Sequence, residues 1–220
     1  MKIFMIYTKV IRDYCSQNKG IIFDISNEYK THFNMIPYKT FCKILNRLVE
    51  EGVLKKISHG SYEIVKDKKD TTDSVVSYYT HSEHGVVVGY SFYNEVGASD
   101  FNDDNIVIYT NLITSKTKTI GNHKLIKVDI NGFNKSIRSI IYMLELIENA
   151  GNIKNCEEVQ RLAMIAVYIP DYLDVFFEEV IESKKYSYST ICTLSRYLND
   201  AHKFNNCLEI YKRVDKESFN

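Results

Sequence analysis

The sequence contains no long apolar run, and this absence excludes membrane-spanning helices from the expected fold. A helix needs roughly 20 consecutive apolar residues to cross a bilayer, and no stretch of the 220 residues approaches that length. The N-terminal segment meets charge again at Lys9, which leaves no room for the apolar core of a signal peptide. We therefore expect a cytoplasmic protein with no membrane partner.

The cysteines are few, scattered and odd in number. The five cysteines are Cys15, Cys42, Cys156, Cys192 and Cys207. No Cys-x-x-Cys pair occurs and the number is odd, so the sequence indicates neither a structural zinc site nor a disulfide framework.

The common motifs of nucleotide and acyl chemistry are also absent. The chain has no GxxxxGK[ST] or GxGxxG loop to bind phosphates, and no GxSxG turn to present a nucleophilic serine. His81, Glu83 and His84 in "THSEHG" are weak candidates for metal ligands, because no third partner follows at a recognisable spacing. We expect a polar loop there, no metal ion and no cofactor.

Charge is balanced over the whole chain but not along it. Residues 1–66 carry 11 Lys and Arg against 6 Asp and Glu, a net charge of +5. Because the formal net charge of the chain is 0, the remainder carries −5. A basic N-terminal part joined to an acidic remainder indicates two partners of different kind, with chance scatter as the alternative.

The pattern of residues 1–66 predicts a helix, a short strand, two helices and a two-stranded hairpin. The first helix is expected at about 3–17 and the strand at 21–23. The second helix should run from a cap at Asp24 or Ser26 to about Phe33, and the third from Pro37 to Gly52. The hairpin strands should lie at 53–57 and 61–65, joined through His59 and Gly60. This order is typical of a winged helix-turn-helix domain.

The third of these helices carries most of the functional information. Its apolar residues form one stripe, Phe41, Ile44, Leu45, Leu48 and Val49, and its polar residues Lys39, Lys43, Asn46, Arg47 and Glu50 form the opposite face. Cations and an amide on one face can neutralise phosphates and hydrogen-bond base edges; the alternative is an ordinary solvated face. The expected DNA-binding residues are Tyr38, Lys39, Lys43, Asn46, Arg47, Lys55, Lys56, His59 and Ser61.

A polar linker and a second domain are expected after the hairpin. Residues 66–73 contain no apolar side chain, which separates a domain at 1–66 from one at 74–220. In the second domain we expect helices at 74–80 and 86–96, strands at about 105–110, 116–120 and 124–129 with a turn at Gly121 and Asn122, and four or five amphipathic helices between about 134 and 214. Apolar stripes mark three of those helices: Ile137, Ile140, Ile141, Leu144 and Ile147; Val159, Leu162, Ala163 and Ala166; Ile191, Leu194, Leu198 and Ala201. The predicted fold class is α+β, a winged helix-turn-helix domain followed by an α+β domain with a small sheet and a C-terminal helical bundle.

One acidic segment raises an enzymatic alternative. In "GYSFYNEVGASDFNDDNIVIYT", residues 89–110, acids precede an apolar strand, and Asp129 follows on a later strand, as in nucleotidyltransferases. Two carboxylates on one face of a strand would bind two Mg²⁺ ions, and strand alternation then requires Asp-x-Asp. The acids here are Asp100, Asp103 and Asp104, so the spacing favours an acidic loop instead.

Three segments resemble a family of bacterial regulators. "LNRLVEEGVLKKISHGSYEI", "GVVVGYSFYNEVGAS" and "NIVIYTNLITSKTKTIGNHKLIKVD" resemble the AbiEi-type antitoxins of type IV toxin–antitoxin (abortive infection) systems over about residues 4–150. The matching positions are Leu45, Leu48, Gly52, Leu54, Gly60, Tyr62, Gly85, Gly89, Ser91, Gly97, Thr110 and Asn111. His59 departs from the pattern, since such wings more often carry arginine there.

The resemblance implies a transcriptional autorepressor rather than an enzyme. Its N-terminal domain would bind double-stranded operator DNA, and its C-terminal domain would counteract a nucleotidyltransferase-like toxin without a stable complex. Two alternatives stay open: a ligand-sensing winged-helix regulator and a nucleotidyltransferase-like enzyme. The sequence leaves the operator and the oligomeric state open.

Overall fold

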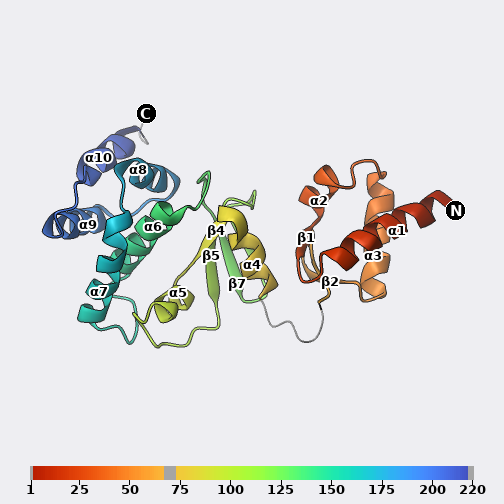
Figure 1. Ribbon diagram of the computed structural model, residues 1–220, viewed down its shortest axis with the longest axis horizontal. Coiled ribbons are helices and arrows are strands. Elements are labelled where there is room, and N and C mark those ends of the chain that lie inside the picture. Colours follow the sequence, from red (N-terminus) through yellow and green to blue (C-terminus); the bar gives the residue numbers. More distant parts are fainter. Residues whose placement is uncertain (1, 67–72, 218–220) are drawn as a thin grey trace. The chain divides into compact units, whose positions relative to one another are not determined.

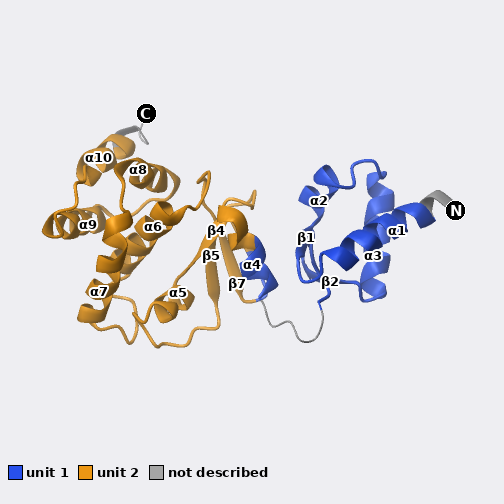
Figure 2. Cartoon of the chain, viewed as in Figure 1, with its two compact units in different colours: residues 1–78, 119–121 blue, residues 79–118, 122–220 orange. Residues whose placement is uncertain are grey.

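The computed structural model describes residues 2–66 and 73–217 and has mixed α+β architecture (Figure 1). It divides into two compact units, residues 1–78 with 119–121 and residues 79–118 with 122–220 (Figure 2). Residues 67–72, the middle of the expected linker, lie outside the described residues. No helix within the described ranges is both long and apolar enough to cross a bilayer.

Unit 1 contains the predicted order of elements. These are α1 (Lys2–Gln17), β1 (Ile22–Asp24), α2 (Ile25–Thr31), α3 (Tyr38–Glu50), β2 (Leu54–Ser58) and β3 (Ser61–Ile64), followed by the start of α4 (Ser74–Thr80). The three strands form an antiparallel sheet in the order β1-β3-β2. β3 is therefore central, and β2 lies at an edge.

Hydrogen bonds between residues close in the chain determine where α2 and α3 begin. The Asp24 carboxylate caps α2 by accepting hydrogen bonds from the backbone N–H groups of Ser26 and Asn27. Pro37 is the N-cap of α3 rather than its first residue, because its backbone is extended while its carbonyl accepts from Thr40 and Phe41. Proline loses nothing in that place, since a cap needs only its carbonyl.

The apolar stripe of α3 is confirmed as the centre of the unit 1 core. Phe41, Ile44, Leu45 and Leu48 are all buried, and Val49 packs at the margin of the same core. The Phe41 ring stacks on that of Phe33, with ring centroids 5.5 Å apart. Burial of one face fixes which face of α3 is left for solvent or a ligand.

A second sheet has four strands in the order β4-β5-β7-β6, of which β4, β5 and β7 belong to unit 2. Its strands are β4 (Gly85–Val88), β5 (Ile106–Thr110), β6 (Thr117–Ile120) and β7 (His123–Lys127). β5 pairs antiparallel with β4 and parallel with β7. The predicted strands and the turn at Gly121 are confirmed, with bounds that differ by one or two residues.

The helix predicted at 86–96 is wrong in its first half. Residues Gly85–Val88 form β4, and α5 (Tyr90–Glu95) follows after Gly89. Three consecutive β-branched valines suit a strand, where they pair with β5. Gly89 has φ +70°, a conformation that glycine adopts without strain and that separates strand from helix.

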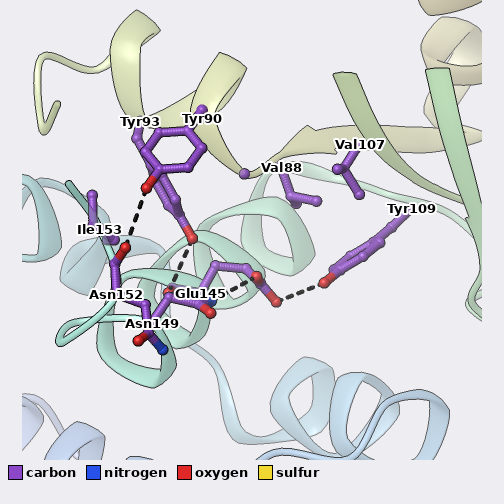
Figure 3. Close-up of a pocket in the computed structure, with 10 residues that line it drawn as sticks. Val88, Tyr90, Tyr93, Val107, Tyr109, Glu145, Asn149, Asn152 and Ile153 are labelled. Carbon is purple, nitrogen blue, oxygen red and sulfur yellow. Dashed lines mark hydrogen bonds between the residues drawn. The ribbon is translucent and has the colours of Figure 1, made fainter. Parts of the chain in front are cut away.

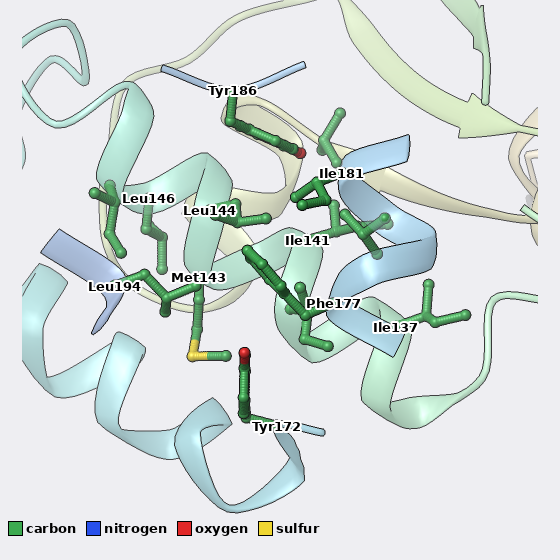
Figure 4. Packing of buried hydrophobic residues seen from close by; sticks show 14 of the residues in the cluster. Ile137, Ile141, Met143, Leu144, Leu146, Tyr172, Phe177, Ile181, Tyr186 and Leu194 are labelled. Carbon is green, nitrogen blue, oxygen red and sulfur yellow. The ribbon is translucent and has the colours of Figure 1, made fainter. Parts of the chain in front are cut away.

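The remainder of unit 2 contains α6 (Lys135–Glu148), α7 (Glu158–Tyr168), α8 (Asp174–Ser183), α9 (Tyr188–Asp200) and α10 (Cys207–Glu217). α7, α8 and α9 pack against α6, and α10 packs against α8 and α9. Buried side chains of α6, α8 and α9 meet in the core (Figure 4). The predicted stripe of α6 is buried throughout, and so are Ile191, Leu194 and Leu198 of α9. Ala201 lies just beyond α9 and is exposed.

The predicted apolar stripe of α7 is wrong. Val159 is 76% exposed, and Ala163 and Ala166 are exposed as well. α7 instead turns Ile165 inward, with Met164 and Tyr168 packed against the core. These larger side chains bury more apolar area than the alanines would, and buried area sets the favoured face.

Candidate nucleic-acid interface

The outer face of α3 presents the polar residues expected to contact DNA. Lys39, Lys43 and Asn46 are exposed, and Tyr38 at the start of the helix is 54% exposed. Within the described ranges, the side chains of the two lysines and of Asn46 have no hydrogen-bond or ion-pair partner. They are available to a ligand without breaking an existing contact.

Arg47 is in a different situation from the lysines. Its Nε donates to Glu51 Oε1 at 2.9 Å, and Arg12 of α1 forms an ion pair with the other oxygen of the same carboxylate. Glu51 therefore neutralises part of the positive charge at this end of α3 and links it to α1.

A hollow of about 240 Å³ lies between α1 and α3 beside this ion pair. Lys9 and Arg12 line it together with Arg47, so the basic surface continues onto α1. These two cations contribute to the net charge of residues 1–66, but they were not among the expected DNA-binding residues. Their spacing of three residues on a predicted helix was the available signal.

The two hairpin lysines project to opposite faces of the sheet. Lys56 is paired directly with Tyr62, and Lys55 with Glu63. Because opposed residues share a face and successive residues alternate, Lys56 lies on the face that packs against α3. Lys55 lies on the other face, where Glu63 accepts a hydrogen bond from Ser74 Oγ at 2.6 Å. The expectation that both lysines extend one basic surface is therefore corrected.

The two remaining candidates for DNA contact lie at the hairpin turn and differ in exposure. His59 is exposed at the turn, next to Gly60 with φ +73°. Ser61 is fully buried, and its hydroxyl donates to Asp24 Oδ2 at 3.4 Å. Ser61 thus holds the hairpin to the cap of α2 and is withdrawn as a DNA contact.

Two of the acids considered for metal-dependent chemistry, Asp103 and Asp129, are engaged in local contacts. Asp103 Oδ1 accepts hydrogen bonds from the backbone and side-chain N–H groups of Asn105, which hold the pKa of Asp103 below its ordinary value. Asp129 forms an ion pair with Lys127 at 2.6 Å. In residues 2–66 and 73–217, no group of three or more His, Cys, Asp or Glu is placed to hold a metal ion.

The motif residues of unit 2 have structural roles. Thr110 Oγ1 donates to the carbonyl of His84 at 2.9 Å, and Asn111 Nδ2 donates to that of Ile130 at 2.8 Å. His84 Nδ1 lies 3.2 Å from Asn111 Oδ1. Gly85 is enclosed so tightly that an added Cβ would lie 2.4 Å from the carbonyl oxygens of Tyr79 and Tyr109.

The strongest electrostatic feature outside unit 1 is a buried carboxylate on α6. Glu145 Oε1 accepts hydrogen bonds from the hydroxyls of Tyr109 at 2.9 Å and Tyr186 at 3.0 Å, and Lys184 Nζ lies 3.3 Å away. Burial, and then the adjacent carboxylate, raise the pKa of both tyrosines. This cluster was not predicted, because its members lie up to 77 residues apart in the sequence and fit no motif.

Comparison with known proteins adds no identification to these sites. No protein-family model matches the chain, and no characterised protein matches it significantly in sequence.

Proposed function

We propose that the chain is a DNA-binding transcriptional regulator and that unit 1 is a winged helix-turn-helix domain. The observation that carries this proposal is the two-sided character of α3. Phe41, Ile44 and Leu48 fix one face in the core, while Lys39 and Lys43 stand unpaired on the other. The helix is thus held rigidly with its cations directed outward.

In this proposal α3 enters the major groove and the rest of the basic surface contacts the backbone. Lys39, Lys43 and Asn46 meet base edges and nearby phosphates, because lysine and asparagine side chains supply the needed donors. Lys56 and His59 contact phosphates from the hairpin. Lys9 extends the phosphate contacts along α1, in line with the net charge of +5 over residues 1–66, while Arg12 is held by Glu51.

The biological role we propose is that of an autorepressing antitoxin of the AbiEi type in the bacterial cytoplasm. The support is the resemblance of the three segments quoted above. Unit 2 would counteract a nucleotidyltransferase-like toxin without a stable complex. Co-expression with an adjacent reading frame of that type tests this role: relief of toxicity supports it, and undiminished toxicity contradicts it.

Titration of duplex DNA at several salt concentrations tests the DNA-binding proposal. The DNA is the region upstream of the chain's own reading frame, with a scrambled duplex for comparison. Lys39→Ala with Lys43→Ala removes two phosphate neutralisations, so the slope of log K against log salt becomes shallower by about 1.8. The control, Lys116→Ala with Lys124→Ala, removes equal charge from exposed positions of unit 2. Equal effects of the two double variants would overturn the proposal.

A further inference from the structure

A cavity of about 230 Å³, open to solvent on one side, lies in unit 2 beside the buried Glu145 (Figure 3). Strand residues Val88 and Val107 form one side of it, and Tyr90 and Tyr93 of α5 another. Asn149, at the end of α6, lies next to Glu145 in its lining. An apolar cavity of about 150 Å³ is large enough to bind benzene, so this one has room for a somewhat larger flat ring.

The charge of Glu145 is already balanced within the protein. The Glu145 side chain is 7% exposed, and its Oε1 receives two tyrosine hydroxyls and the Lys184 ammonium. The ammonium also lies 3.9 Å from the centroid of the Tyr186 ring. A cationic ligand would meet an already paired carboxylate and a nearby lysine, so the cavity favours a neutral molecule.

The hydroxyl donors around the cavity are engaged by the protein itself. Tyr93 donates to the Glu145 carbonyl at 3.5 Å, and Tyr90 donates to the Asn152 carbonyl at 3.1 Å (Figure 3). Glu145 Oε2 receives one amide hydrogen bond, from Asn149 Nδ2 at 3.2 Å. Among the residues that the structure describes, none donates to Asn149 Oδ1. The cavity therefore offers hydrogen-bond acceptors and aromatic ring faces to a ligand.

We propose that this cavity binds a neutral, flat heterocycle that carries an amino group. Its ring would lie against Tyr93 and Tyr109, and its N–H groups would donate to Glu145 Oε2 and Asn149 Oδ1. A bound ring would shield these acceptors from water, and an acceptor shielded without a donor is costly, so a ring without the amino group would bind less tightly. This proposal concerns unit 2 alone and does not rest on DNA binding.

Calorimetric titration of the full chain with adenine, and with purine as the analogue without the amino group, tests the proposal. We expect one adenine per chain with a dissociation constant below about 1 mM and purine weaker by at least about tenfold. Absence of adenine binding at several times that concentration, or equal binding of purine, would overturn it.

Two variants locate the binding. Val107→Phe places a large ring in the cavity, and Ile106→Phe places the same ring on the opposite face of β5. We expect adenine binding to be lost in Val107→Phe and kept in Ile106→Phe, and unchanged binding in a folded Val107→Phe chain contradicts the proposal. If that variant does not fold, nuclear Overhauser contacts in the unmodified chain decide: contacts from adenine to the Tyr93 and Tyr109 rings support the site, and contacts only elsewhere overturn it.

Discussion

The guanidinium of Arg47 and the carboxylate of Glu51 lie 2.9 Å apart at the end of α3, one helical turn from each other. Arg12 of α1 binds the same carboxylate. One acid thus occupies two arginines that border the proposed DNA-binding face. It joins two helices and, at the same time, reduces the positive charge offered to phosphates.

Replacing Glu51 by Gln should therefore strengthen DNA binding. Both arginines gain freedom to contact phosphates, so the salt slope should steepen by about 1 to 2. The free energy of unfolding should change by less than about 1 kcal/mol, because the ion pairs are exposed. Salt-dependent titration and urea unfolding measure the two quantities. Glu50→Gln is the control, since Glu50 is exposed on the same helix without such contacts; equal effects of both changes would contradict the interpretation.

The two hairpin lysines should differ in their effect on DNA binding. Lys56→Ala should weaken binding and lower the salt slope by about 0.9, because Lys56 is on the α3 face of the sheet. Lys55→Ala should leave both nearly unchanged, since Lys55 lies beside Glu63 on the other face. The same titration compares the two single variants, and a larger loss from Lys55→Ala would refute the assignment of faces.

Gly85→Ala should destabilise unit 2. The new methyl group would meet two backbone oxygens that cannot move independently, and such overpacking costs about 1 to 3 kcal/mol. Denaturant unfolding monitored by circular dichroism measures the loss. Gly151→Ala is the matched control, because an added Cβ there meets nothing within 4 Å. The prediction fails if the two glycine variants are equally stable.

Unit 2 should lose stability at high pH through its buried tyrosines. Burial, and then the nearby Glu95, raise the pKa of Tyr142 to about 12. A phenol whose pKa is higher in the folded chain keeps its proton there after the unfolded chain has lost it. The contribution of Tyr142 to the free energy of unfolding is therefore complete below about pH 10, and it falls as the pH rises toward 12.

Tyr142→Phe isolates this effect. The stacking of residue 142 on Phe92, with centroids 3.9 Å apart, is available to phenylalanine as well. Between pH 10 and 12 the loss of unfolding free energy should be smaller in the variant by up to about 1.4 kcal/mol per pH unit. Urea titrations at pH 9, 10 and 11 measure it, and identical pH dependence of both chains would disprove the prediction.

The parts that the sequence predicts well are those fixed by local pattern. The stripe of Phe41, Ile44 and Leu48 has helical spacing and one apolar face, so the helix and its orientation follow from residues close in the chain. Val86 to Val88 fit a buried strand or part of a helix equally well by periodicity, although their β-branched side chains favour the strand. Pairing with β5, some 20 residues later, decides between the two.

The parts that could not be predicted depend on contacts between distant residues. Ser61 looked exposed beside a turn, but its hydroxyl reaches Asp24, 37 residues earlier. The local sequence presents Arg47 as free to contact DNA. In the folded chain, Glu51 binds both Arg47 and Arg12. The orientation of α7 likewise depends on which neighbours cover it, and the chain's local pattern carries no such information.

The edge position of β2 has a consequence for self-association. A strand at the border of a sheet leaves backbone N–H and C=O groups open to pairing with a strand of another molecule, and charged side chains, lysine above all, discourage this. β2, at the edge of the sheet, carries the consecutive residues Lys55 and Lys56. Lys55, which has no place in the proposed DNA contact, then helps to keep two copies of the sheet from joining.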